Sequence, residues 1–190
     1  MGSQVVSAPT VVIVEGVSDR VALETLARRR GRDLVAECIS VVPIGGAQSI
    51  GRFLERLAAP GRDVRLAGLC DAGEERDFRR GLERAGLGSD LTRAAMERLG
   101  FYVCVEDLED ELIRSLGPAS VEDVLDAQGD LGSFRTFQQQ PAQRGKTSEA
   151  QLRRFLGTRS GRKAQYACVL VDALDLGRVP RPLDGLLAHL

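Results

Sequence analysis

The chain has 190 residues, of which 43% are hydrophobic and 28% are charged, so it is long enough for one compact α/β domain with a sizeable core. Its formal net charge of −1 excludes a polycation that holds nucleic acid through its overall charge. A phosphate-bearing partner must then be held by a local basic patch, by metal ions or by another protein. The only histidine, His189, lies beside the C-terminus, which argues against chemistry that needs a histidine base or several imidazole ligands.

The sequence favours a cytoplasmic protein with no membrane partner. No apolar run approaches the roughly 20 residues that a bilayer span needs. The first ten residues lack the charged segment and long apolar stretch of a secretory signal. The four cysteines are widely spaced, without the pattern of a zinc knuckle or redox motif, and we expect buried free thiols.

The first half of the chain alternates between strands and helices. Val11 to Val14 is a short β-branched run that is typical of a buried parallel strand. Ser18 is a suitable N-cap for a helix to about Arg30. The pattern predicts further strands over residues 38–42, 64–70 and 101–105. It predicts helices over residues 50–57 and from 75 to about 84, and a further helix that runs through residue 96. This alternation predicts a mostly parallel four-stranded sheet flanked by helices, with ligands beyond the carboxyl ends of its strands.

No strand pattern returns after residue 107. The sequence predicts helices over residues 107–116, 120–127, 149–156 and 163–174. Residues 128–145 are rich in Gly and Gln and favour a loop, and the Pro-containing tail after residue 177 is weakly specified. We therefore expect an α/β core over residues 10–116 and a C-terminal helical extension over residues 117–190 that packs on it.

Acidic residues follow three of the four predicted strands. They are Glu15 and Asp19 after the first strand, Asp71, Glu74 and Glu75 after the third, and Glu106, Asp107 and Glu109 after the fourth. The carboxyl ends of parallel strands share one edge, so these side chains can converge there. Crowded carboxylates raise one another's pKa unless a cation compensates, and Mg²⁺ prefers such oxygen ligands. Each acid also has a simpler interpretation, as a partner of a helix dipole or of a surface arginine.

The segments that carry these acids resemble motifs of the TOPRIM domain in the overcoming-lysogenization-defect (OLD) nuclease family. Val14-Glu15-Gly16-Val17-Ser18-Asp19 resembles the first motif, and Leu69-Cys70-Asp71-Ala72-Gly73-Glu74 occupies the place of the second. Asp107-Leu108-Glu109-Asp110-Glu111-Leu112 resembles the segment after the last core strand, and Gly161-Arg162-Lys163-Ala164 resembles a late lysine motif. Together they span about residues 10 to 172 in the family's order.

The resemblance implies a TOPRIM fold, which is Rossmann-like, and a site that binds Mg²⁺ or Mn²⁺ ions, with two ions as the family's arrangement. It implies that Glu15, Asp19, Asp71 and Glu109 ligate or directly support the metal. Glu15 could also hold the attacking water or act as its base, and Lys163 would contact the scissile phosphate. One departure is Gly73, which stands where the second motif has an aspartate, and Glu74 is the candidate replacement. Whether Glu106, Asp107 or Glu109 faces the metal stays open.

The function that this resemblance implies is a metal-dependent nuclease that hydrolyses phosphodiester bonds, in DNA rather than RNA. Gly73 favours an alternative, a non-catalytic TOPRIM module that binds nucleic acid or regulates a partner. A primase-like nucleotidyl transferase ranks last, because no triphosphate pocket is visible. Full-length OLD nucleases carry an ATPase domain, so a stand-alone TOPRIM chain is expected to work with a separate ATPase or a repair or defence partner.

Two further groups of residues are candidates for nucleic-acid binding. Gly45 and Gly46 lie in a strand-to-helix turn, where they could bring backbone amides to a phosphate or simply allow a tight turn. Arg159 and Arg162 stand beside Lys163 and form a basic cluster.

Two other basic segments are weaker candidates. Arg153 and Arg154 fit a solvated helix face. Gly145-Lys146-Thr147 ends like a phosphate-binding loop, but it lacks the upstream glycine and the preceding strand.

Overall fold

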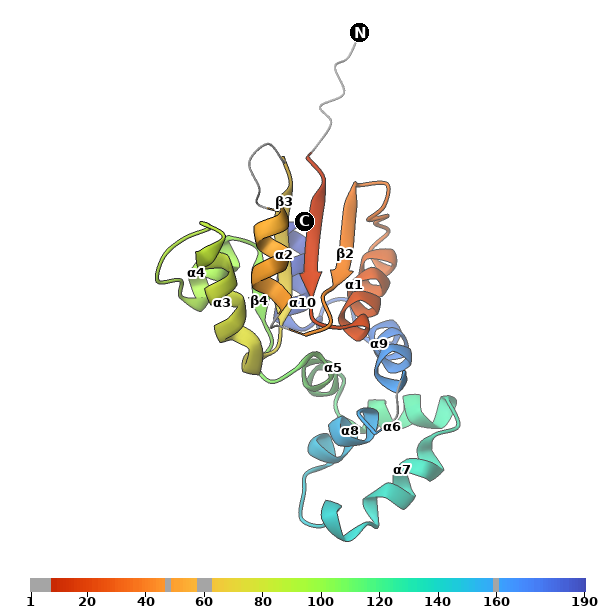
Figure 1. Cartoon of the computed structure of the whole chain (residues 1–190). Coiled ribbons are helices and arrows are strands. Elements are labelled where there is room, and N and C mark those ends of the chain that lie inside the picture. Colours follow the sequence, from red (N-terminus) through yellow and green to blue (C-terminus); the bar gives the residue numbers. More distant parts are fainter. Residues whose placement is uncertain (1–7, 47–48, 58–62, 159–160) are drawn as a thin grey trace.

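The computed structural model of the chain describes residues 8–46, 49–57, 63–158 and 161–190 (Figure 1). Its centre is a four-stranded sheet of order β2-β1-β3-β4 in which every neighbouring pair is parallel. The strands are β1 (Thr10–Val14), β2 (Ile39–Pro43), β3 (Arg65–Cys70) and β4 (Phe101–Val103). This confirms the predicted parallel sheet flanked by helices, and β4 is shorter than the predicted strand.

Helices cover both faces of the sheet. The helices of the first half are α1 (Val17–Arg29), α2 (Ile50–Leu57), α3 (Glu75–Arg84), which follows the 3₁₀ turn η2 (Ala72–Glu74), and α4 (Arg93–Arg98). The β1 side chains alternate between two hydrophobic clusters, because successive side chains of a strand point to opposite faces. Val12 and Val14 pack in the cluster that contains α1, and Ile13 packs with residues of α2, α3 and α4.

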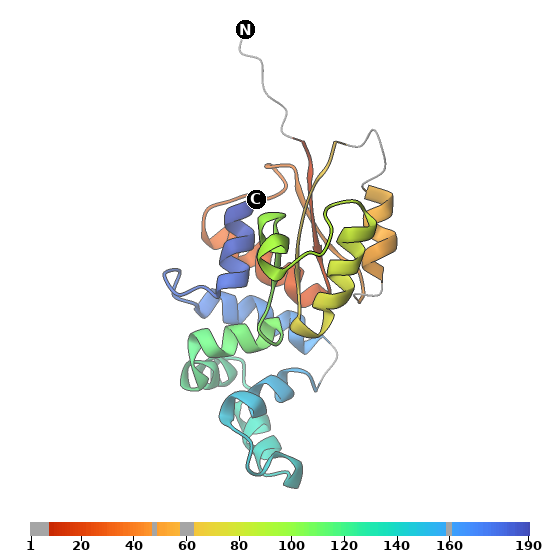
Figure 2. The same cartoon turned by 90° about the vertical axis from the view of Figure 1, so that its left-hand side faces the viewer.

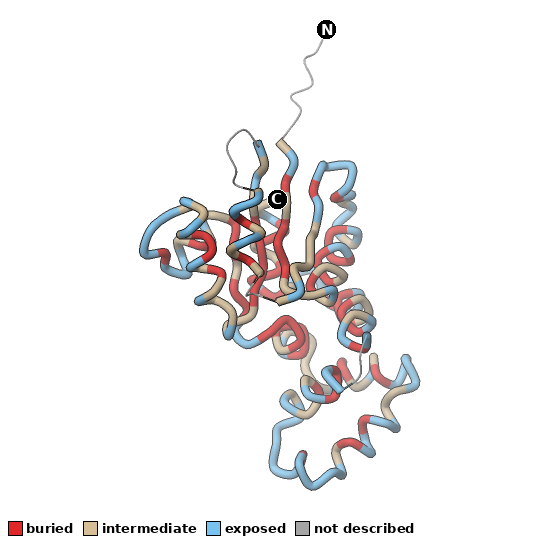
Figure 3. Tube along the Cα trace, in the orientation of Figure 1, coloured by how far each residue is buried: buried red, intermediate tan, exposed pale blue. Residues whose placement is uncertain are grey.

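The second half of the chain is helical, and part of it lies beyond the carboxyl ends of the strands (Figures 1 and 2). Its elements are α5 (Leu108–Leu116), α6 (Pro118–Ala127), α7 (Leu131–Gln138), the 3₁₀ turn η3 (Pro141–Gln143), α8 (Ser148–Leu156), α9 (Arg162–Ala173) and α10 (Arg181–His189). Helix α9 packs along α1, and α10 packs against β3 and β4. The C-terminal helices thus form part of the core, and Figure 3 shows buried segments in the sheet and in these helices.

Two helices lie where no helix was predicted. Helix α7 occupies the segment predicted as a loop, and its Phe134 and Phe137 are buried with ring centroids 5.2 and 5.5 Å from that of Phe155. Helix α10 occupies the weakly specified tail. Its first turn contains a proline, which a helix start tolerates, and Leu183 and Leu186 are buried. In both helices a few apolar anchors outweigh a composition that favours loops.

The cysteines only partly follow the prediction of buried thiols. Cys70 and Cys104 are buried, whereas Cys168 is half-buried and Cys38 is exposed. Within the described ranges, no helix has the length and apolar character that crossing a membrane requires.

Candidate metal centre at the carboxyl edge of the sheet

The acids that follow β1, β3 and β4 lie at the carboxyl edge of the sheet, close enough for their charges to raise one another's pKa. The clearest case is Asp71, directly after β3. Burial, followed by the charges of Asp19, Glu15, Asp107 and Glu109, raises the pKa of Asp71 to about 8. The acids of three separate strand–helix connections therefore meet as one negative cluster.

Glu15 has an unsatisfied oxygen. Burial, and then the negative charge of Glu74, raises the pKa of the Glu15 carboxyl, while Lys163 opposes the rise. Its Oε2 atom is buried and accepts no hydrogen bond from the described residues. A buried carboxylate oxygen without a donor is costly, so this atom favours a cation or a proton donor beside it.

Asp19 lies in the first turn of α1 and is 8% exposed. Its Oδ2 accepts a hydrogen bond of 2.7 Å from the Gly16 backbone amide, which satisfies an amide at the start of the helix. Burial nevertheless raises the pKa of Asp19 to about 7, because the neighbouring Glu109 and Glu15 add to the effect of desolvation. The carboxyl both caps the helix and faces the acidic cluster.

Glu109 is the acid after β4 that pairs with the late lysine. It is 5% exposed on α5, and its Oε2 accepts a hydrogen bond of 2.8 Å from Lys163 Nζ. Burial lowers the pKa of Lys163, but the hydrogen bond and the charges of Glu109, Asp107 and Asp71 outweigh burial and raise it. Lys163, from the first turn of α9, therefore stays protonated within the cluster.

Asp107 has both of its carboxylate oxygens occupied in this structure. Its Oδ1 caps α5 by accepting the Asp110 amide at 2.8 Å, and its Oδ2 accepts Arg153 Nε at 2.7 Å. Arg153 also lies 3.5 Å from Glu106, which is exposed. These contacts tie Asp107 to the start of α5 and to Arg153 of α8. The sequence analysis placed Arg153 on a solvated helix face and missed its pairing with Asp107, because the two residues lie 46 positions apart.

The second motif places Glu74, rather than position 73, beside the cluster. Gly73 is exposed within η2, and a Cβ atom built there would meet no atom within 4 Å. Glu74 is the negative charge that raises the pKa of Glu15 most, so its carboxylate lies near Glu15. An acid therefore remains available on this connection although the aspartate of the motif is missing.

The donor set fits a hard divalent cation. It consists of carboxylate oxygens with raised pKa values and one buried oxygen without a donor. Across the described ranges, however, no three His, Cys, Asp or Glu side chains are grouped so that they could hold an ion as they stand. Lys163 and Arg153 hold Glu109 and Asp107, so either of these two carboxylates could join an ion only if its contact changes.

The two glycines after β2 serve the turn. Gly45 and Gly46 have φ angles of +70° and +116°, which side-chain-bearing residues rarely adopt. The Gly45 amide donates a hydrogen bond of 3.0 Å to the Glu15 carbonyl, so it is already occupied and ties this turn to the candidate centre. The geometry thus favours the interpretation as a tight turn over a phosphate contact by the Gly45 amide.

Of the two arginines beside Lys163, the structure describes Arg162. Arg162 is buried, with its guanidinium carbon 4.2 Å from the centroid of the Phe155 ring. Its Nη1 donates to the Phe155 carbonyl and to Thr158, and its Nη2 lies 3.5 Å from Asp130. Arg162 therefore anchors α9 to its neighbours and has no free face for a phosphate, which corrects the expected role. Arg159 lies outside the described residues.

Comparisons with known proteins agree with this architecture. Residues 8–71 match the family model described as "Overcoming lysogenization defect protein-like, TOPRIM domain". The C-terminal region of the Xanthomonas campestris pv. campestris OLD protein is similar, with 20% identity, a TM-score of 0.72 and coverage of 96% of this chain and 94% of that one. The C-terminal region of the Burkholderia pseudomallei OLD protein has 17% identity, a TM-score of 0.72 and 96% coverage of both chains. These structures share the fold over nearly the whole chain. A search of curated proteins finds no match.

Proposed function

We propose that the protein is a metal-dependent nuclease that hydrolyses phosphodiester bonds in nucleic acid, because residues 8–71 match the OLD-like TOPRIM domain model. The observation that carries the proposal is the meeting of acids from three strand ends around one lysine. Around Asp71, for example, burial and the charges of four neighbouring carboxylates together raise the pKa to about 8. A cluster of this kind favours compensating cations, and bound divalent ions can recruit a phosphate.

Four acids are the proposed ligands. Glu15, Asp71 and Glu74 come from the first two motifs, and Glu109 joins them once Lys163 is released from it. Asp19 supports the site from the first turn of α1, where its carboxyl is tied to the Gly16 amide. Mg²⁺ or Mn²⁺ ions, two where Glu74 replaces the missing aspartate, would polarise the phosphate, activate water and stabilise the leaving oxygen.

The chain's own groups would act on the proton and the charge. Glu15 accepts the proton of the attacking water as the general base. Lys163 exchanges its hydrogen bond with Glu109 for one with a phosphate oxygen, where its charge stabilises the negative charge that develops. Arg153 keeps Asp107 on the cap of α5 and so holds Glu109 in place.

DNA is the proposed substrate, and an ATPase or another repair or defence protein supplied in trans is the proposed partner. We place this activity in the cytoplasm.

Cleavage assays test the proposal directly. The purified protein is incubated with plasmid DNA, single-stranded DNA and RNA in the presence of Mg²⁺, Mn²⁺ or a chelator. The same assays are run on Glu15→Gln and Lys163→Met, with Glu24→Gln, an exposed carboxylate on α1, as the matched control. Metal-dependent cleavage that is lost in the first two variants and kept in the control supports the nuclease.

The alternative function that Gly73 favours, a non-catalytic module, predicts a different result in this experiment. If Gly73 leaves the metal site impaired, the wild-type protein binds nucleic acid without cleaving it under any metal condition. That outcome favours a non-catalytic module. Product that lengthens only when nucleoside triphosphates are added favours nucleotidyl transfer.

A further inference from the structure

A basic groove runs from the candidate metal centre along α8. It has a volume of about 590 Å³ and is lined by Asp107, Lys146, Ala150, Arg153, Arg154, Gly157, Thr158 and Lys163. Two of these residues, Asp107 and Lys163, also belong to the acidic cluster or contact it. The groove and the candidate centre are therefore continuous.

The groove concentrates positive charge in a chain whose net charge is −1. Four of its lining residues are cationic, and its single acid, Asp107, is paired with Arg153. Lys146 and Arg154 are exposed, and neither side chain makes a hydrogen bond or ion pair with any residue in the described ranges. Both charges are thus available for a ligand, which distinguishes them from the arginines that are engaged elsewhere in the fold.

Both chain lysines line this groove, and they come from separate elements. Lys146 immediately precedes the N-cap of α8, and Lys163 lies in the first turn of α9. Gly157, between them in sequence, lies beside the second lysine, since a Cβ atom built there would be in ordinary van der Waals contact, 3.8 Å from Lys163 Cε. The groove therefore offers a row of cations that begins at the candidate catalytic lysine and continues away from the acids.

We propose that this groove binds the nucleic-acid backbone next to the scissile bond, with Lys146 and Arg154 contacting phosphates that flank the one at Lys163. The inference rests on the proposed function and adds the path that the substrate strand takes. An anionic backbone, rather than a small anion, fits a groove that is open and elongated along a helix and shares a wall with the centre. Contacts of this kind position a strand without reading its sequence.

Salt-dependent binding measures these contacts. Fluorescence anisotropy with labelled single-stranded and duplex DNA is recorded at several KCl concentrations in a Glu15→Gln background, which prevents cleavage. The test variant replaces both exposed cations, by Lys146→Ala and Arg154→Ala together. It is expected to bind all DNA sequences more weakly, to the same extent for each. Each lost phosphate contact lowers the slope of log K against log salt by about 1, so the double variant should lose about 2.

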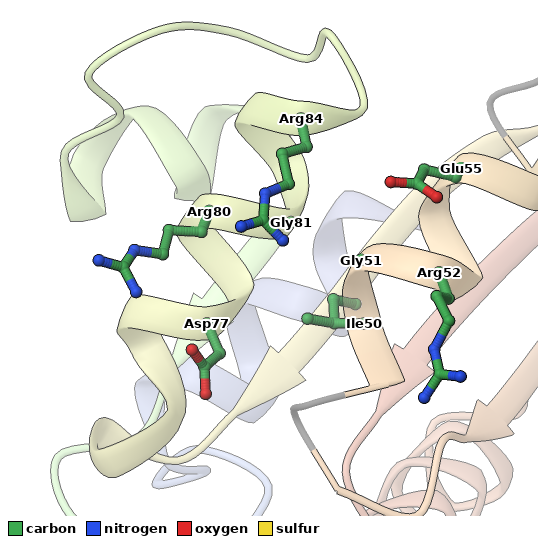
Figure 4. A pocket seen from close by; sticks show the side chains of 8 residues that line it. All are labelled: Ile50, Gly51, Arg52, Glu55, Asp77, Arg80, Gly81 and Arg84. Carbon is green, nitrogen blue, oxygen red and sulfur yellow. The ribbon is translucent and has the colours of Figure 1, made fainter.

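A second groove supplies the matched control. It lies between α2 and α3, has a volume of about 350 Å³, and is lined by Arg80 and Arg84 from α3 and by Arg52 and Glu55 from α2 (Figure 4). The two helices that form it pack on the face of the sheet that carries Ile13. Replacing Arg80 and Arg84 by alanine removes the same charge as the test variant and should leave the salt slope close to that of the parent. Circular dichroism of both double variants checks that they are folded.

The outcomes separate this inference from the proposed function. An unchanged salt slope in the test variant, or an equal loss of slope in the test and control variants, overturns the proposal that this groove binds the backbone. This holds even where the wild-type protein cleaves nucleic acid. A loss of slope in the test variant alone supports binding of the backbone in the groove, even where no cleavage is found and the nuclease proposal fails. In a protein that cleaves, the test variant should show a raised KM with little change in kcat.

Discussion

Replacing Asp19 by asparagine should stabilise the metal-free protein above neutral pH. Asp19 is 8% exposed, and burial beside Glu109 and Glu15 raises its pKa from an ordinary value of 3.8 to about 7. An asparagine has nearly the same shape and can still accept the hydrogen bond from the Gly16 amide. The substitution therefore removes the titrating charge while the helix start is kept.

The pKa of Asp19 sets the sign and the size of the effect. Between about pH 4 and pH 7 the folded protein holds a proton that the unfolded chain has released, so stability falls as pH rises and levels off above the folded pKa. A tenfold change in an ionisation constant corresponds to about 1.4 kcal/mol, which makes the full loss about 4 kcal/mol. Part of it has occurred by about pH 5, so about 3 kcal/mol remains between about pH 5 and pH 8.5.

Urea unfolding at these two pH values measures the difference. The chain contains no tryptophan, so the helical circular dichroism signal is the suitable probe. The advantage of Asp19→Asn over the wild-type protein should grow by about 3 kcal/mol from the lower to the higher pH. Mg²⁺ should restore part of the wild-type stability at the higher pH, because a bound cation compensates the carboxylates. Parallel stability curves for the two proteins would refute the reasoning.

Three further perturbations test separate contacts. In the metal-free protein, an NMR titration should give the Glu15 carboxyl a midpoint above the ordinary glutamate range, because burial and the charge of Glu74 raise its pKa, and added Mg²⁺ should lower that midpoint because a cation stabilises the charged form; a midpoint in the ordinary range without metal contradicts this placement. Arg162→Met removes the buried guanidinium over Phe155, which also bonds the Phe155 carbonyl, and leaves Tyr166 as the hydrogen-bond partner of Asp130; it should lower the free energy of unfolding by about 2–4 kcal/mol, measured by urea titration, without changing the salt slope of DNA binding. Leu186→Ala in α10 should cost about 2–5 kcal/mol by the same titration, and a loss below 1 kcal/mol would show that α10 is not part of the cooperative core.

The sheet could be predicted because its signals are local. The β-branched run of β1 and the helical spacing of α1 indicate their structures without reference to the rest of the chain. Parallel pairing follows from the helices between strands. The position of the acids follows as well, because a residue directly after a parallel strand lies at the carboxyl edge. Glu15 and Asp71 lie there for this reason.

Helices α7 and α10 could not be predicted because their stability depends on distant partners. The Gly/Gln-rich segment of α7 has weak helix propensity, and it is fixed by Phe134 and Phe137 against Phe155 of α8. Helix α10 is fixed by its leucines against β3 and β4. Neither contact can be inferred before the sheet and the C-terminal helices are arranged in space.

The opposite roles of Arg162 and Lys163 show why a basic cluster in a sequence does not define a binding surface. Consecutive residues of an α-helix point about 100° apart, so only one of the two can face the acids. The register of α9 against α1 directs Arg162 into the interior over Phe155 and turns Lys163 toward Glu109, 54 residues away. In the proposed reaction this register matters more than the number of positive charges, because Lys163 can pass from Glu109 to a phosphate only while Arg162 holds the start of α9 in place.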